Sequence, residues 1–350
     1  MLTVITTVLM LGLLILVHEA GHFLVARRSG VLCHEFSIGF GPLLYSWEGS
    51  ETTYSLRAIP LGGYVLMAGE TASALEGEPP PDDEVGRRMT DKPVGTRAAI
   101  MAAGPLTNVI LAFLVFFLIY AAVGVPYPSL TVNEVQEGYP AESSGIEVGD
   151  RIVAVSGEPV EEWMDVVTLV RGNPGETLTV TVERDGTTSE FELTPTAVEE
   201  AGETFGYAGI GSETEQVRFP ITTSLLQALS WTFTVILLLG RTIGEILVGT
   251  TGTDQLMGVV GIGAEVGRAT QMGLASVLSL AGSISASVGF INLLPLPVLD
   301  GGRLLLLGVE AVSGNRLDPQ KEGLINLVGV ALLILLALYV TVQDVLRLSG

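Results

Sequence analysis

Two of the three histidines in this 350-residue chain lie four residues apart, in the stretch HEAGH. Positions i and i+4 share one face of a helix, so His18 and His22 can direct ring nitrogens at a single Zn²⁺. Glu19 lies about 100° around the helix axis, where its carboxylate can face a water molecule instead of the metal. The motif therefore predicts zinc-dependent hydrolysis with Glu19 as the general base.

A catalytic zinc usually has three protein ligands and one position left for water. Asp300 ends the apolar run from Leu293 to Leu299, which is an unusual place for a carboxylate without a cation. Asp300 and Glu19 would also balance the charge of one Zn²⁺, so we expect Asp300 to be the third ligand. The alternative is that Asp300 caps the helix that follows it. His34 is a weaker ligand candidate and is expected at the surface.

Pro295 and Pro297 lie just before this aspartate. Two prolines so close together cannot both occupy a regular helix interior, so the backbone there is expected to be unwound. An unwound segment leaves carbonyl groups free, and Asn292 adds a side-chain amide. We expect these residues to hold an extended substrate beside the metal. The alternative is a simple proline kink in a continuous helix.

The elements around these residues must be largely embedded in a membrane. Hydrophobic residues make up 48% of the chain, yet long polar blocks interrupt them. We expect an α-helical multi-pass membrane protein with about four transmembrane helices, a membrane-associated β-hairpin and an inserted α+β domain. The first apolar stretch is expected to be retained, because its basic pair follows it and it has no cleavage site. The predicted spanning helices are 2–26, 99–123, 274–297 and 323–342.

A fifth apolar stretch, 221–240, also passes a hydropathy criterion. If it crossed the membrane alone, Asp300 would lie on the face opposite His18, so we expect it to be interfacial or partly inserted. Arginines and lysines flank the ends of the spans that should be cytoplasmic, as Arg27 and Arg28 do after the first one. The active site is therefore expected near the cytoplasmic face.

The net charge of −21 argues against nucleic acid as a partner. Residues 125–220 carry 19 acidic residues against four arginines, a net charge of −15, and are expected outside the cell. A single cysteine, Cys33, excludes an internal disulfide.

Two strand-like runs around a Glu-Gly-Ser-Glu turn predict the hairpin 36–66, and 70–95 is expected to be a polar loop.

The acidic block has alternating strand-like runs around one short helix, with Asp185-Gly186 as a hairpin turn. We expect a small α+β domain of five or so strands. The expected division of the chain is an N-terminal membrane part, this domain, a helical connector and a C-terminal membrane part, at 1–124, 125–216, 217–270 and 271–350.

Several stretches together resemble the site-2 protease family of intramembrane zinc metalloproteases, in its bacterial branch that performs regulated intramembrane proteolysis. They are HEAGHF, GFGP (39–42), GGYVLMAGE (62–70), GPLTN (104–108) and NLLPLPVLDGG, and the resemblance covers nearly the whole chain. It implies one zinc held by His18, His22 and Asp300, with Glu19 as the catalytic base. One departure is Val259, where the family commonly has a proline after glycine.

The same resemblance implies substrate-binding roles for other residues. Asn292 would place the substrate or stabilise the oxyanion, and Gly62, Gly63 and Tyr64 belong to a membrane-associated hairpin beside the active site. The stretch YPAESSGIEVGDRIVAVSGEP resembles the core of a bacterial PDZ domain, and FGYAGIG (205–211) resembles the part that holds a peptide carboxylate.

The implied function is cleavage of single-pass membrane proteins in the bacterial inner membrane, with anti-sigma factors and remnant signal peptides as family-level substrates. Two alternatives stay open. One is a non-catalytic scaffold that recruits partners through the PDZ-like domain. The other is a metal or proton transporter, which is less well supported because no second cluster of ligands lies across the bilayer.

Overall fold

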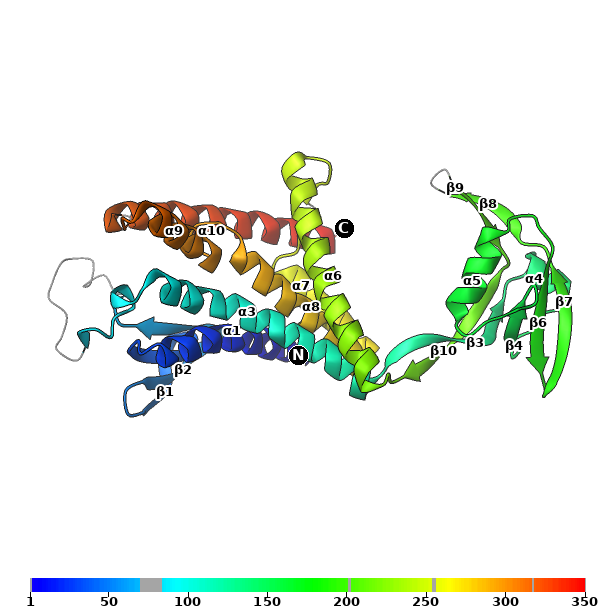
Figure 1. Cartoon of the computed structure of the whole chain (residues 1–350), viewed down its shortest axis with the longest axis horizontal. Helices are drawn as coiled ribbons and strands as arrows, with labels where there is room; N and C mark the ends of the chain where they lie inside the picture. Colours follow the sequence, from blue (N-terminus) through cyan, green and yellow to red (C-terminus); the bar gives the residue numbers. More distant parts are fainter. Residues whose placement is uncertain (1, 70–83, 201–202, 254–255, 317, 350) are drawn as a thin grey trace. The chain divides into compact units, whose positions relative to one another are not determined.

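The computed structural model describes residues 2–69, 84–200, 203–253, 256–316 and 318–349. The chain divides into two units, one formed by Met1–Val123 with Pro220–Gly350 and the other by Gly124–Phe219. The first unit contains the long helices (Figure 1) and the HExxH motif, and the second is the acidic block. Most of the expected polar loop, residues 70–83, lies outside the described residues.

Helix α3 is at the centre of the first unit and contacts α1, α6, α8 and α9. Glycines let these helices approach closely, as is common between membrane helices. A Cβ on Gly21 of α1 would lie 2.5 Å from Oγ1 of Thr107, and one on Gly289 of α8 would lie 2.8 Å from the carbonyl oxygen of Pro105. The helices are α1 (Leu2–Arg28), α3 (Val94–Leu118), α6 (Ile221–Val248), α7 (Val259–Met272), α8 (Leu274–Leu293), α9 (Asp300–Ser313) and α10 (Pro319–Ser349).

Five of the described helices are long and apolar enough to cross a membrane: α1, α3 with the π-turn Ile119–Val123, α6, α8 and α10. Four of them share one direction, whereas α6 runs across that direction (Figure 1). The expectation of about four spans is therefore neither confirmed nor contradicted, because α6 meets the same criteria of length and composition.

Several predicted helix ends were wrong. Helix α8 ends at Leu293 instead of residue 297, because residues 294–299 fold into bends and turns around the two prolines. The proline kink in a continuous helix is therefore excluded. Helix α3 begins at Val94, directly after Pro93, and α10 extends well beyond 323–342 at both ends.

Helix α7 begins at Val259, the position where the family commonly has proline. Proline favours the first turn of a helix, and here another residue provides a start signal. The buried carboxylate of Asp344 on α10 accepts hydrogen bonds from the backbone N–H groups of Gly258 and Gly261, at 3.0 and 2.7 Å. A negative charge at this end also suits the helix dipole, so the departure does not prevent the helix from forming.

Strands β1 (Cys33–Glu48) and β2 (Thr53–Met67) pair antiparallel, and both bend midway. Residues 35–38 pair with 53–56 on one side and with 63–66 on the other, so the two strands form a sheet of four short segments. The bends occur where glycines adopt positive φ, 88° at Gly39 and 133° at Gly62. As a result, the stretch 63–67 forms an edge that pairs only with 33–38 among the described residues.

The second unit is built on an antiparallel sheet with strand order β10-β3-β4-β6-β7, with β5 paired to β4, and a separate β8-β9 pair. The expected number of five or so strands was an underestimate, because the described residues of this unit form eight strands. The hairpin turn at Asp185 and Gly186 is confirmed, with φ of 52° and 74°. The elements are β3 (Val125–Val135), α4 (Pro140–Ser144), β4 (Arg151–Val155), β5 (Glu158–Pro159), α5 (Trp163–Gly172), β6 (Leu178–Arg184), β7 (Thr187–Leu193), β8 (Thr196–Glu200), β9 (Glu203–Tyr207) and β10 (Ile210–Val217).

Inward-facing aliphatic side chains of β4, β6 and α5 form the core of this unit, among them Ile152, Val166 and Val182. Burying each such side chain contributes about 1.5–3 kcal/mol. One charged group is also buried there. Burial acts against the ionised form of Asp150, but hydrogen bonds from the Arg184 guanidinium and the Glu147 N–H outweigh it and hold the pKa of Asp150 below its usual value.

Candidate metal centre

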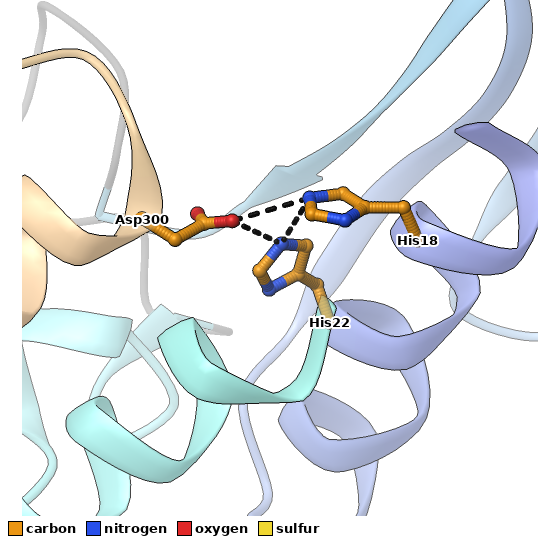
Figure 2. Close-up of side chains that lie close together, drawn as sticks. All are labelled: His18, His22 and Asp300. Carbon is orange, nitrogen blue, oxygen red and sulfur yellow. Dashed lines mark hydrogen bonds and ion pairs between the residues drawn. The ribbon is translucent and has the colours of Figure 1, made fainter. Parts of the chain in front are cut away.

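Helix α1 brings the side chains of His18 and His22 together on one buried face, as the motif predicts. Their Nε2 atoms lie 3.2 Å apart. Asp300, at the start of α9, directs Oδ2 at the pair, 3.1 Å from Nε2 of His18 and 3.4 Å from Nε2 of His22 (Figure 2). Residues separated by almost 280 positions in sequence therefore converge on one point.

The spacing of these three atoms fits a tetrahedral zinc site. With Zn–N and Zn–O bonds of about 2.0–2.2 Å, two ligands of a tetrahedral ion lie about 3.3 Å apart. The observed separations of 3.1, 3.2 and 3.4 Å bracket that value. The donor set, two imidazoles and one carboxylate, is one that catalytic zinc sites use, and it leaves a fourth position for water.

Asp300 is placed by the loop that precedes it. The N–H of Leu296 bonds to the carbonyl of Leu294 at 2.7 Å, and Val298 has a positive φ of 77°, so residues 294–299 form a tight reversal. Asp300 is the first residue of α9, and the N-cap is Leu299, without a side-chain capping bond. The alternative role of Asp300 as a helix cap is therefore wrong, and its carboxylate turns towards the histidines instead (Figure 2).

The two glycines after Asp300 are required by this reversal. A Cβ on Gly301 would overlap the carbonyl oxygens of Leu293 and Leu294, and one on Gly302 would overlap the carbonyl of Leu296. Glycine at both positions lets the first turn of α9 fold directly onto the loop. The two glycines thus have a steric reason to follow Asp300.

Helix α3 forms the other wall of the site. The ring nitrogen Nδ1 of His22 donates to the carbonyl oxygen of Ile100 at 2.8 Å, and the amide of Asn108 lies 3.4 Å from Nδ1 of His18. Gly104 lies between them, and a Cβ there would be 2.8 Å from Nε2 of His18 and closer still to Nε2 of His22. Positions 100, 104 and 108 share one face of α3 because they are four residues apart.

Sequence analysis gave these three residues of α3 no role, although GPLTN contributed to the family resemblance. The signal was present as a glycine and an asparagine four residues apart in an apolar stretch. Only the packing of α3 on α1 shows that this face contacts the histidines.

An ion pair between Arg97 and Glu310 joins α9 to α3. Arg97 near the start of α3 donates to both carboxylate oxygens of Glu310, at 3.0 and 2.5 Å. Both side chains are largely buried, and the bidentate geometry restrains their relative orientation. Because α9 carries Asp300, this ion pair supports the position of the candidate third ligand.

The remaining sequence-predicted residues lie around this cluster. Gly63 of β2 is next to Glu19, the candidate base, since a Cβ there would be 3.5 Å from Cγ of Glu19. Asn292 is half-buried in the last turn of α8, Pro295 is exposed, and Pro297 contacts α10, where a Cβ on Gly329 would lie 2.5 Å from its ring. His34 is not part of the cluster of His18, His22 and Asp300. Its Nε2 instead lies 3.0 Å from Oε1 of Glu84.

Tyr64 belongs to a polar group on the sheet beside the site. Burial acts against the charged form of Glu35, but hydrogen bonds from Ser55, Arg57 and Tyr64 outweigh it and hold the pKa of Glu35 below its usual value. The same carboxylate, together with burial, raises the pKa of Tyr64. Glu35 therefore stays ionised and links its own segment of β1 to the two segments beside it, to 53–57 through Ser55 and Arg57 and to 63–67 through Tyr64.

Comparison with known proteins agrees with the geometry. Residues 6–336 match the family model described as Peptidase family M50. The chain belongs to this family. This M50 peptidase is 32% identical to the zinc metalloprotease RasP of Geobacillus kaustophilus, over 98% of this chain and 97% of that protein. It is 30% identical to the regulator of sigma-W protease RasP of Bacillus subtilis, over 99% of each chain.

The site-2 protease resemblance is thus confirmed, and the M50 peptidase is a zinc metalloendopeptidase of membrane-embedded substrates. Zinc is its cofactor, and its apolar helices make it a membrane protein. The alternative functions, a non-catalytic scaffold and a transporter, find no support in these matches.

Among solved structures, the PDZ domain of an SdrC-like protein from Listeria monocytogenes matches with 21% identity and a TM-score of 0.22, covering 25% of this chain and 90% of that one. At that score the match carries no argument about the fold.

Proposed function

We propose that His18, His22 and Asp300 hold the single zinc ion and that Glu19 is the general base of an intramembrane endopeptidase. The observation that carries this assignment is the convergence of three ligand atoms from α1 and α9 at separations suited to one tetrahedral ion. A buried carboxylate beside two buried imidazoles is costly without such a cation.

Bound there, Zn²⁺ supplies Lewis acidity to the scissile carbonyl and to water. Glu19 follows His18 on α1 and lies against the backbone of Gly63. From this position its carboxylate takes a proton from the attacking water and passes it to the leaving amide nitrogen. The Asn292 amide and the backbone of residues 294–299 orient the carbonyl group of the substrate, with Pro295 and Pro297 keeping that segment out of a helix.

A transmembrane substrate must be unwound before attack, because its carbonyl groups are hydrogen-bonded within a helix. The edge segment 63–67 can receive an extended strand, since its pairing with 33–38 uses only one side. Gly63 at the start of this edge is next to Glu19, and Gly62 and Tyr64 flank it. An added strand would therefore bring a scissile bond to the base.

The membrane arrangement that suits this chemistry has α1, α3, α8 and α10 as spans and α6 at the interface. The crosswise direction of α6 supports this arrangement (Figure 1). Arg27 and Arg28 at the end of α1 support a cytoplasmic position for the HExxH end of that helix, by the positive-inside rule. The exposed apolar side chains of the β1–β2 sheet, such as Leu44, Tyr45 and Trp47, would enter the bilayer surface there.

The inserted domain, residues 125–216, is proposed as a PDZ-like selector outside the cell. A pocket of about 230 Å³ lies between α5 and the segment 205–210, lined by apolar side chains such as Val166 and Val170, with Arg171 at its edge. Such a pocket suits a peptide that ends in an apolar residue and a free carboxylate. For the full chain in detergent, a fluorescent peptide with a free carboxyl terminus should bind at least tenfold more tightly than its amidated form. Equal affinities would contradict this role.

The assignment of the base is tested by Glu19→Gln. This change keeps the size of the side chain but removes its ability to accept a proton, so cleavage of a membrane-embedded reporter should be abolished while one zinc per chain is retained. Glu265→Gln on α7, where the carboxylate pairs with the exposed Arg268, is the matched control and should remain active. Undiminished cleavage by the Glu19 variant would refute the proposed role.

A further inference from the structure

The amide of Asn108 is fully buried at the contact between α1, α3 and α8, with no exposed surface. Its Nδ2 lies 3.4 Å from Nδ1 of His18, and within the part of the chain that the structure describes its Oδ1 has no hydrogen-bond partner. An asparagine in such a place costs free energy unless its hydrogen bonds have a purpose. Among the described residues, the hydrogen-bond contact of its side chain is to the ring of a metal-ligand candidate.

The two nitrogens of the His18 ring have different partners. Nε2 points at His22 and Asp300, and is therefore the ligand atom (Figure 2). A neutral imidazole that binds metal through Nε2 carries its proton on Nδ1, and that proton needs an acceptor. Half a turn of the Asn108 amide about χ2 exchanges its two atoms and presents Oδ1 to Nδ1 of His18.

His22 has the equivalent arrangement with a backbone partner. Its Nδ1 donates to the carbonyl of Ile100, two helical turns before Asn108 on the same face of α3. One helix therefore supplies the outer hydrogen bond of both histidines, once from the backbone and once from a side chain. Gly104 between these positions leaves the room for the rings.

We propose that Asn108 is a positioning residue that accepts the Nδ1–H hydrogen bond of His18 and so fixes the ring tautomer and orientation for zinc. This inference rests on the proposed metal site and adds to it a residue outside the ligand set. Hydrogen-bond partners behind a metal ligand typically contribute 10- to 100-fold to metal affinity.

The test is zinc affinity, measured by chelator competition on the purified full chain in detergent. Asn108→Leu keeps the approximate size of the side chain without an acceptor and should weaken zinc binding 10- to 100-fold. Asn108→Asp keeps an acceptor at the same place and should bind zinc within threefold of the wild type or more tightly. Asn108→Ala, which adds no bulk and favours helix, should lose affinity as Asn108→Leu does, so a folding defect of the leucine variant does not decide the outcome.

Ser285→Ala is the control for packing. Ser285 of α8 donates to the backbone carbonyl of Asn108 at 2.8 Å. The change therefore disturbs the contact between α8 and α3 at Asn108 and leaves the side-chain amide of Asn108 in place. Zinc affinity should stay within threefold of the wild type. Wild-type affinity in both Asn108→Leu and Asn108→Ala, an equal loss in Ser285→Ala, or no rescue by Asn108→Asp would each overturn the proposal. Failure of the metal site itself is a separate outcome. In that case the His18→Ala and His22→Ala variants would keep the zinc that the wild type binds.

Discussion

Replacing Gly104 by alanine tests the geometry of the metal centre with one added methyl group. The new Cβ would lie 2.8 Å from Nε2 of His18, 2.7 Å from Cε1 of His22 and closer still to Nε2 of His22. Ordinary contacts between such atoms are about 3.5 Å, so the rings would have to move by about 0.7 Å or more. Zinc ligands tolerate displacements of only about 0.2 Å.

We therefore expect Gly104→Ala to weaken zinc binding by at least about 100-fold, or about 2.8 kcal/mol. Global destabilisation is not the expected cause, because alanine favours a helix over glycine by about 0.5–1 kcal/mol. Gly95→Ala is the matched control in the same helix, since an added Cβ there meets nothing within 4 Å. It should keep wild-type zinc affinity and activity.

The assay is zinc content and chelator competition on detergent-purified protein, with thermal unfolding measured in parallel. The expected pattern is a zinc-poor but folded Gly104→Ala protein beside a zinc-loaded Gly95→Ala protein. If Gly104→Ala bound zinc with wild-type affinity, the two imidazoles could not both be ligands in the observed positions, and the site geometry argued above would be refuted.

Two further predictions concern the loop before Asp300 and the inserted domain. Gly301→Ala should displace the first turn of α9 from the carbonyls of Leu293 and Leu294, and so reduce both zinc content and cleavage. Gly308→Ala in the same helix is the control, because its added Cβ meets nothing within 4 Å, and it should change neither quantity. Equal behaviour of the two variants in a zinc assay would contradict the role given to the loop. Asp150→Asn should destabilise the inserted domain by about 2 kcal/mol, because it leaves part of the Arg184 charge unpaired, while Arg151→Gln, at an exposed pair with Glu183, should change its stability by less than about 0.5 kcal/mol. Because the folded-state pKa of Asp150 is lowered, Asp150 contributes to the free energy of unfolding above the unfolded pKa of about 3.9, and this contribution is lost as the pH falls through the folded-state pKa. Thermal unfolding followed by circular dichroism should therefore show the stability difference between wild type and Asp150→Asn shrinking only below about pH 4. A difference that stayed constant down to pH 2 would exclude this linkage.

The motifs predicted which side chains the fold brings together, because each motif carries its chemistry in local spacing. A four-residue interval is enough to put His18 and His22 on one helical face, and an aspartate after an apolar run requires a cation wherever the run is buried. The prolines likewise predicted unwound backbone before Asp300, although the helix ends four residues earlier than expected. The hairpin turn at Asp185 and Gly186 was also readable from sequence.

Other features were not readable because they depend on which faces meet. The roles of Ile100, Gly104 and Asn108 follow from the packing of α3 against α1, and an apolar helix does not reveal from its own sequence which face a neighbour will cover. The double pairing of residues 35–38 requires both strands to bend, and the two flanking segments were interpreted as one simple hairpin.

The amino-acid sequence by itself determined the chemical groups: a histidine pair with the spacing of zinc ligands, a carboxylate between them, a distant aspartate and a membrane environment, because each is expressed in residue type and short-range spacing. The tertiary structure alone decided that these groups meet, that Gly104 leaves space for them and that Asn108 lies behind His18. Convergence of helices separated by hundreds of residues depends on close packing over their whole surfaces, and no local pattern encodes that.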